Sequence, residues 1–168
     1  MASDRELIAD VAGGSEVAFQ ELYERFADRV YRYAYTILRA RHLAEEVAQE
    51  AMIAVWKGAS KFAGRSKVST WIFGIARNQA YSLVRKEMRT ERVPDVVLVD
   101  PDPAPDIQRQ ERVARALERL SADHREVVFL TFYEGLSYGE IASILGIPTG
   151  TVKSRMFHAK RQLAEALG

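Results

Sequence analysis

The sequence contains no cysteine, and four of its five prolines fall within one short stretch. Without thiols the chain can form neither a disulfide nor a thiolate metal site. It also has no run approaching the ~20 apolar residues that a membrane-spanning helix needs. Residues 1–10 carry acidic side chains where a signal peptide would have an apolar core. We therefore expect a cytoplasmic protein with no membrane insertion, and its 48% hydrophobic content predicts folded cores.

The net charge of +1 hides an uneven distribution of charge along the chain. Residues 57–92 hold nine basic side chains and only two acidic ones, Glu87 and Glu91, whereas residues 93–110 hold four aspartates and one arginine. A local basic excess of this size is typical of a segment that binds a polyanion. The alternative interpretation is a solvated helix face, because most charge runs are of that kind.

The proline cluster separates two helical patterns. Pro94, Pro101, Pro103 and Pro105 lie within residues 92–107, a stretch without helical periodicity. Each proline removes a backbone donor and disfavours helix at the residue before it. The sequence therefore predicts an all-α protein with two small helical domains, residues 1–91 and 108–168, joined by an extended, acidic, proline-rich linker at 92–107.

Three helices are predicted in the first domain. One begins near Ser15 and carries apolar residues at spacings of three and four, a second spans about 43–59, and a third runs from 68 or 69 to about 88. The outward face of the second helix combines acidic, amide and large apolar side chains, namely Glu46, Gln49, Glu50, Ile53 and Trp56. An ordinary acidic helix surface with a half-buried tryptophan would have the same pattern.

The second domain has the spacing of a helix-turn-helix. One helix is predicted over about 107–120 and another from near Ser121. Ser137 and Glu140 form a capping box, which starts a short helix that Gly146 ends, and the next helix begins at Pro148 or Thr149. These features predict two consecutive helices joined by a tight turn.

The last predicted helix, residues 149–167, has the composition of a recognition helix. Its apolar face packs inward, and the opposite face carries hydroxyl and basic groups suited to base edges and phosphates. These groups are Thr151, Lys153, Ser154, Arg155, His158, Lys160 and Arg161. The alternative is a helical hairpin that only packs and leaves this face in water.

Two sets of motifs resemble a known family. Residues 136–142, 146–148 and 150–155 closely resemble region four of bacterial sigma factors of the extracytoplasmic-function (ECF) group, within the sigma-70 family. Residues 44–50 through Trp56, and 67–72 through Asn78, look like sigma region two. The resemblance covers about residues 17–167. It implies a factor that binds core RNA polymerase and directs promoter-specific transcription initiation, of a stress or envelope-response regulon, with no enzymatic activity, no cofactor and no metal.

The resemblance also implies a role for particular residues. It implies that Glu46, Gln49, Glu50, Ile53 and Trp56 bind the clamp helices of the polymerase β′ subunit. It places the minus-thirty-five contacts on Thr149, Thr151, Lys153, Ser154, Arg155, His158 and Arg161. It also implies that the melted minus-ten element is bound by Arg65, Ser66, Lys67, Ser69, Thr70, Trp71, Arg77, Asn78, Tyr81, Ser82 and Arg85. The polymerase β flap and an anti-sigma factor are further expected partners.

Several alternatives remain at this point. Trp71 and Phe73 could be core residues, which we favour for Phe73, and Asn78 could make a hydrogen bond within its helix. A different helix-turn-helix protein, such as an activator with a sensing first domain, would need a ligand pocket or phosphoacceptor in that domain. A pure protein-interaction module is disfavoured by the basic segment. An enzyme ranks last, because the three histidines are scattered and no phosphate-binding loop is present.

Overall fold

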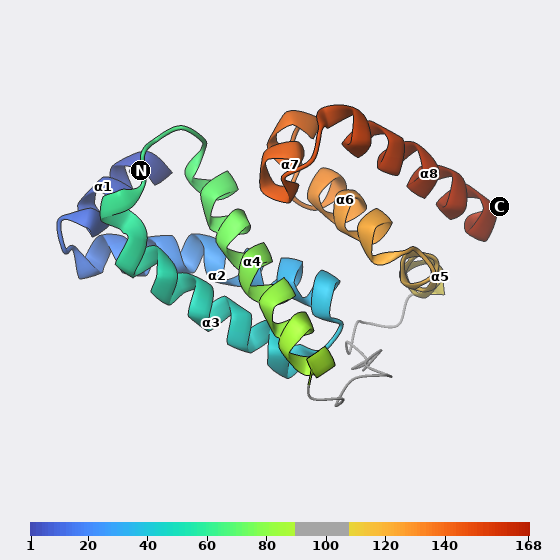
Figure 1. Ribbon diagram of the computed structural model, residues 1–168, viewed down its shortest axis with the longest axis horizontal. Coiled ribbons are helices and arrows are strands. Elements are labelled where there is room, and N and C mark those ends of the chain that lie inside the picture. Colours follow the sequence, from blue (N-terminus) through green and yellow to red (C-terminus); the bar gives the residue numbers. More distant parts are fainter. Residues whose placement is uncertain (90–107) are drawn as a thin grey trace. The chain divides into compact units, whose positions relative to one another are not determined.

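The computed structural model describes residues 1–89 and 108–168, and every regular element in those two ranges is helical (Figure 1). The chain divides into two compact units, residues 1–99 and 100–168. The all-α prediction is confirmed. The predicted linker at 92–107 lies outside the described residues. None of the described helices is long and apolar enough to cross a membrane.

Helix α2, Glu16–Leu38, forms the centre of the N-terminal unit, and it begins where the sequence predicts. The Ser15 hydroxyl accepts a hydrogen bond from the Ala18 amide at 3.1 Å, which caps the first turn. The middle of the apolar stripe predicted for this helix is buried, with Leu22, Phe26 and Val30 fully covered, whereas Phe19 and Ile37 at its ends are half-buried. The stripe therefore positions α2 as the surface on which the other helices of this unit pack.

Helices α3, Arg41–Gly58, and α4, Val68–Arg89, both pack on α2 and on each other. A short 3-10 turn, η1, Ala59–Lys61, follows α3. Phe73 of α4 is fully buried and meets the ring of Tyr33 edge-on, with 5.6 Å between the ring centroids. The preference for Phe73 as a core residue is thus confirmed.

Helix α1, Asp4–Ala12, was not predicted. The Ser3 hydroxyl accepts a hydrogen bond from the Glu6 amide at 3.1 Å and caps the helix. Leu7, Ile8 and Val11 are buried, because the helix packs on α2 and on η1. The first residues of the chain are therefore part of the N-terminal core.

The C-terminal unit consists of α5, Gln108–Glu118, α6, Ala122–Phe132, α7, Tyr138–Leu145, and α8, Thr149–Leu167. Arg125 of α6 donates hydrogen bonds to the carbonyl groups of Leu117, at 3.4 Å, and Leu120, at 3.0 Å, where α5 ends. These bonds satisfy carbonyl groups that a helix end leaves unpaired. They join α5 to the apolar core that α6, α7 and α8 share.

The predicted helix-turn-helix is confirmed in detail. The Glu140 amide donates to the Ser137 hydroxyl, and the Ser137 amide donates to the Glu140 carboxylate, each at 3.1 Å. Gly146 ends α7 at φ +67°, a conformation that residues with a side chain rarely adopt. The capping box and this glycine set the angle at which α8 leaves the turn.

Candidate nucleic-acid interface

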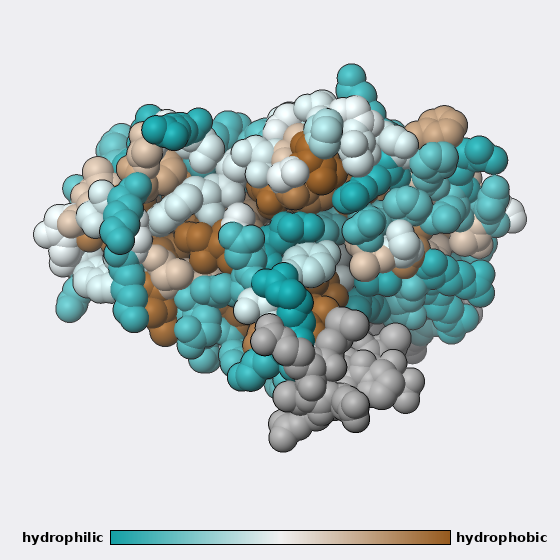
Figure 2. Space-filling view, in the orientation of Figure 1, coloured by the Kyte–Doolittle hydropathy of each residue, from teal (hydrophilic) through white to brown (hydrophobic). Residues whose placement is uncertain are grey.

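Helix α8 presents one polar face to solvent and buries the other. Val152, Met156 and Ala159 are buried against the rest of the unit. The predicted contact residues Thr149, Lys153, Ser154, His158 and Arg161 are exposed, and Thr151 is half-buried. The visible side of this unit is mostly hydrophilic (Figure 2). The helix can therefore offer hydroxyl and cationic groups to a polyanion without disturbing its packing.

Arg155 differs from the other basic residues of α8 because it has an acidic neighbour. Its guanidinium lies 3.8 Å from the Asp123 carboxylate of α6, and its side chain is 25% exposed. A weak ion pair at this distance offsets part of its charge. Arg155 is thus held against α6, whereas Arg161 is open to solvent.

Phe157 is an exposed aromatic residue on α8 that the sequence reasoning missed. Its side chain is 58% exposed, its ring meets that of His158 edge-on, and the Arg161 guanidinium lies 5.9 Å from the ring centre. A phenylalanine one residue off the buried stripe at Met156 was the signal available in the sequence. An apolar ring beside basic groups suits contact with the methyl group of thymine.

A second feature is the outward face of α3. Glu46, Gln49, Glu50, Ile53 and Trp56 are all exposed, and Trp56 is 37% exposed. Phe19 of α2 meets the Trp56 ring edge-on, with 5.3 Å between the centroids. One side of the indole therefore packs on α2. We call these five residues of α3 the α3 face.

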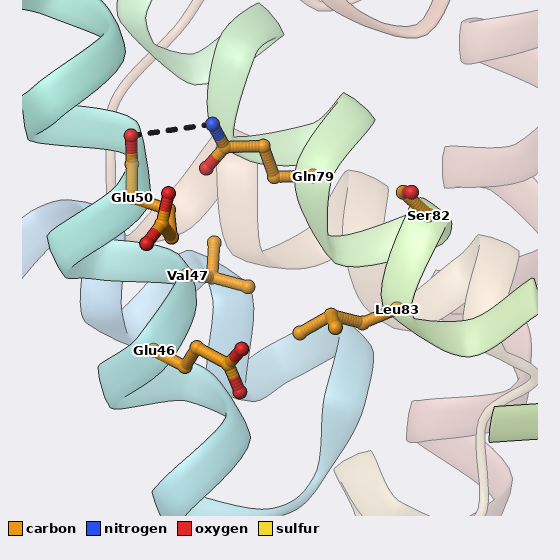
Figure 3. Close-up of a pocket in the computed structure, with 6 residues that line it drawn as sticks. All are labelled: Glu46, Val47, Glu50, Gln79, Ser82 and Leu83. Carbon is orange, nitrogen blue, oxygen red and sulfur yellow. Dashed lines mark hydrogen bonds between the residues drawn. The ribbon is translucent and has the colours of Figure 1, made fainter. Parts of the chain in front are cut away.

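The α3 face borders a groove between α3 and α4. The groove is lined by Glu46, Val47 and Glu50 from α3, and by Gln79, Ser82 and Leu83 from α4 (Figure 3). The Gln79 amide nitrogen donates to the Glu50 backbone carbonyl at 3.3 Å, which ties the two helices together. Ser82, predicted to contact DNA, therefore lies beside two residues predicted to contact the polymerase.

The residues predicted to handle the melted strand occupy the start of α4 and the loop before it. Arg65 and Lys67 are exposed, and Ser66 and Ser69 are half-buried. Thr70 is only 6% exposed, because its side chain faces the interior of the unit. Trp71 is half-buried and packs on Phe62, with 5.1 Å between ring centroids. The loop rather than these two side chains offers the accessible surface.

The remaining predicted residues follow one side of α4. Asn78, Ser82 and Arg85 are exposed, and no hydrogen bond joins the Asn78 side chain to another described residue. Arg77 lies with its guanidinium 4.5 Å from the centre of the Tyr81 ring. This pair presents a flat cationic and aromatic surface of the kind on which an unstacked base can lie.

Within residues 1–89 and 108–168 no three histidine, cysteine, aspartate or glutamate side chains gather as metal ligands would. Among the described residues, α3 exposes an acidic and apolar face, and α4 and α8 expose basic surfaces.

Both parts of the chain match known protein families. The Sigma-70 region 2 family matches residues 22–90, and the Sigma-70 region 4 family matches residues 110–163. The chain is 36% identical to the ECF RNA polymerase sigma factor RpoE of Cereibacter sphaeroides over 149 residues, covering 84% of this chain and 81% of that one. It is 34% identical to the ECF RNA polymerase sigma factor SigM of Mycobacterium tuberculosis over 170 residues, covering 99% and 85%.

Solved structures give the same result. CnrH in complex with the cytosolic domain of CnrY is 27% identical and has a TM-score of 0.74, covering 98% of this chain and 96% of CnrH. The sigma factor RpoE of Bartonella quintana, in complex with the anti-sigma factor NepR, is 30% identical with a TM-score of 0.74, covering 89% and 96%.

A helix-turn-helix unit with a basic recognition face, following a helical unit with an exposed acidic and aromatic face, defines a non-enzymatic DNA-binding factor of transcription. The chain belongs to the sigma-70 family, in its extracytoplasmic-function group. It binds core RNA polymerase and promoter DNA, and it directs promoter-specific transcription initiation.

Proposed function

We propose that the N-terminal unit docks on the clamp helices of the polymerase β′ subunit through the α3 face. The observation that carries this proposal is that all five side chains of the face are exposed on one side of a single helix. Glu46, Gln49 and Glu50 supply polar groups toward one end of the face, and Ile53 and Trp56 supply exposed apolar groups toward the other. Protein interfaces combine apolar and polar contacts, and tryptophan is frequent among their strongest contacts.

Charge reversal on the α3 face tests this assignment. The double variant Gln49→Ala with Glu50→Lys should reduce co-purification with core polymerase by about tenfold or more, because a lysine would meet cations that a carboxylate attracts. The control makes the same two changes on α2, as Gln20→Ala with Glu24→Lys, where both residues are exposed. If the α3 variant still co-purifies as the control does, the docking assignment is wrong.

We also propose that the two DNA-binding surfaces bind different forms of the promoter, one double-stranded and the other melted. Region four, with α8, reads the minus-thirty-five element as duplex, since a helix fits the major groove. Region two holds the melted minus-ten strand with the loop at residues 62–67 and the outer side of α4. Exposed cations, the Arg77–Tyr81 pair and the exposed amide of Asn78 favour single-stranded DNA at this surface.

The remaining expectations concern location and partners. We propose that the factor acts in the cytoplasm, that region four also contacts the polymerase β flap, and that an anti-sigma factor restrains it until a stress or envelope signal arrives. The similar sigma factor RpoE of Bartonella quintana is held by the anti-sigma factor NepR, which supports this last expectation.

A further inference from the structure

The unpredicted helix α1 contacts the loop at residues 62–67. The Arg5 guanidinium, on the exposed side of α1, donates a hydrogen bond to the Gly64 carbonyl at 3.1 Å. The two residues are 59 positions apart in the sequence. This bond therefore joins the first helix of the chain to the loop that precedes α4.

Gly64 lies at the centre of this contact. Its φ is +72°, which favours glycine, so the loop turns sharply at this position. A Cβ added at Gly64 would lie 3.4 Å from a terminal nitrogen of Arg5. Arg5 thus packs closely against the backbone of the loop and also bonds to it, beside the exposed cations Arg65 and Lys67.

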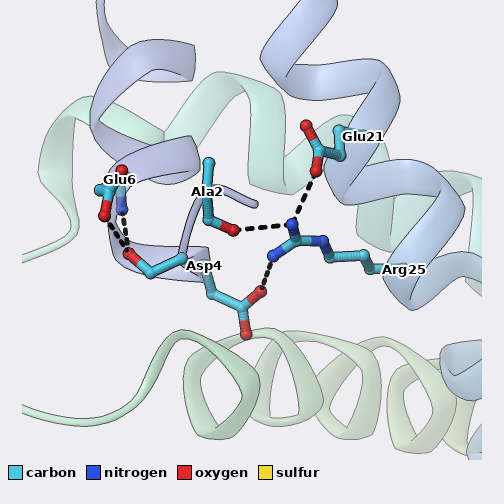
Figure 4. Close-up of polar contacts among 6 residues, drawn as sticks. Ala2, Asp4, Glu6, Glu21 and Arg25 are labelled. Atoms are coloured by element: carbon cyan, nitrogen blue, oxygen red, sulfur yellow. Dashed lines mark hydrogen bonds and ion pairs between the residues drawn. The ribbon is translucent and has the colours of Figure 1, made fainter.

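Helix α1 is itself anchored by Arg25 of α2 (Figure 4). The Arg25 guanidinium contacts the Asp4 carboxylate at 2.9 Å, the Ala2 carbonyl at 2.7 Å and the Glu21 carboxylate at 2.6 Å. The side chain is 23% exposed, so this charge network is partly shielded from water. The Asp4 hydrogen bond raises the pKa of Arg25. An arginine is charged at physiological pH in any case, so these ion pairs persist there.

The anchoring fixes where Arg5 stands. Arg25 holds both the residue before the Ser3 cap and the first residue of α1, and Leu7 and Ile8 bury the other side of the helix. These contacts hold the start of α1 in place. The backbone that carries Arg5 is therefore fixed relative to the rest of the unit. A bond from a fixed element holds a loop in one conformation better than a bond from a mobile one.

We propose that Arg5 is a positioning residue that holds the loop at residues 62–67 in the conformation that receives the melted promoter strand. This proposal rests on the proposed function of the loop. Arg5 acts through the Gly64 carbonyl, and Arg25 acts through α1. The base-contacting groups are those of the loop and α4, so removal of Arg5 leaves them all present but less well placed.

The first test is made on the full-length protein without DNA. Deuterium uptake by the loop at residues 62–67 should be faster in Arg5→Ala than in the wild type, by about two- to tenfold, the range expected for the loss of one hydrogen bond. The control is Asp10→Ala, which removes an exposed side chain from the same helix. Equal loop uptake in Arg5→Ala and in the wild type would overturn the proposal.

The second test is made with holoenzyme on promoters that carry each base at every position of the downstream element, in pre-melted form. Arg5→Ala should reduce the preference for the best base by about two- to tenfold and should leave the salt dependence of promoter binding unchanged. Unchanged base preference would overturn the proposal. A shallower salt dependence would also overturn it, since Arg5 would then be contacting a phosphate directly.

Two further experiments distinguish a failure of the Arg5 proposal from a failure of the proposed role of the loop. Gly64→Ala keeps the carbonyl that Arg5 contacts but strains the turn at φ +72°, so it should lose at least as much base preference as Arg5→Ala. Wild-type base preference in Gly64→Ala would overturn the proposal, because the conformation of the loop would then not matter. A wild-type holoenzyme with no base preference on these promoters would instead refute the proposed role of the loop, while the uptake measurement would still decide whether Arg5 holds it.

Discussion

Basic side chains on the same helix differ in how free they are to reach DNA. Arg155 and Arg161 both lie on α8, but the first pairs with Asp123 and the second is exposed beside Phe157. A cation with a carboxylate 3.8 Å away must give up part of that attraction before it can bind a phosphate. At equal distance from DNA, Arg161 is therefore the stronger contact.

At the level of single residues we also predict that Asn78 reads a base. Its amide can both donate and accept, and it is exposed on the side of α4 that carries Arg77 and Tyr81. Holoenzyme with Asn78→Ala should lose discrimination at one position of the downstream element, worth about 1–3 kcal/mol. The measurement is initiation from promoters with each base at every position, in paired and pre-melted forms.

The control for Asn78 is Lys86→Ala, an exposed change on the same helix. It should weaken binding to all promoters alike, because it removes one cation from the sequence-independent attraction to phosphates. Wild-type base preference in Asn78→Ala, in both promoter forms, would show that Asn78 does not read sequence.

Some residue positions could not be predicted from the sequence. Thr70 is expected at the DNA surface, yet it is buried, because it lies on the inward side of the first turn of α4, whereas Ser69 and Trp71 are half-buried. Helical periodicity predicts which residues share a face of a helix. It does not predict how far the residues at the edge of that face are buried. Phe157 shows the converse, since hydrophobicity suggests burial and the structure exposes it.

Helix starts are the elements that the sequence predicts best. Ser15, Ser121 and Ser137 each cap a helix that was expected at that place. Helix α1 has the same signal as α7, a serine with glutamate three residues later, at Ser3 and Glu6. The prediction omits α1 because it considers residues 1–10 only as a possible targeting segment. The contact of α1 with the loop before α4 joins residues far apart in sequence, and no local pattern predicts it.

The capping box of α7 leads to a prediction at the scale of one element. Ser137→Ala should destabilise the C-terminal unit by about 1 kcal/mol, because it removes the acceptor for the Glu140 amide. Thermal unfolding followed by circular dichroism measures this change. Ser143→Ala is the matched control, since Ser143 lies exposed in the interior of the same helix and alanine is the better helix former there. Equal shifts in the two variants would contradict a capping role.

At the scale of the whole molecule, the C-terminal unit has its own core and should act alone. We predict that residues 108–168 bind duplex DNA weakly and with a steep salt dependence, because most of the attraction comes from a few cations. Arg161→Ala should weaken this binding by about 1–3 kcal/mol without loss of helicity. Fluorescence anisotropy at several salt concentrations measures both effects.

The control for the isolated unit is Arg115→Ala on α5, where the arginine already pairs with Glu111. It removes the same charge from another helix and should change affinity much less. If Arg161→Ala lowers helicity and leaves the affinity of the folded fraction unchanged, Arg161 has a packing role instead.

The two tryptophans of the chain, Trp56 and Trp71, both lie in the N-terminal unit. Trp56 sits on the α3 face and is partly in water, whereas Trp71 packs on Phe62 beside the loop. Tryptophan emission therefore comes from two places, one at the proposed polymerase contact and one at the proposed site of strand capture. Exciting tryptophan selectively, so that the tyrosines do not contribute, gives an optical record of region two in which region four is silent.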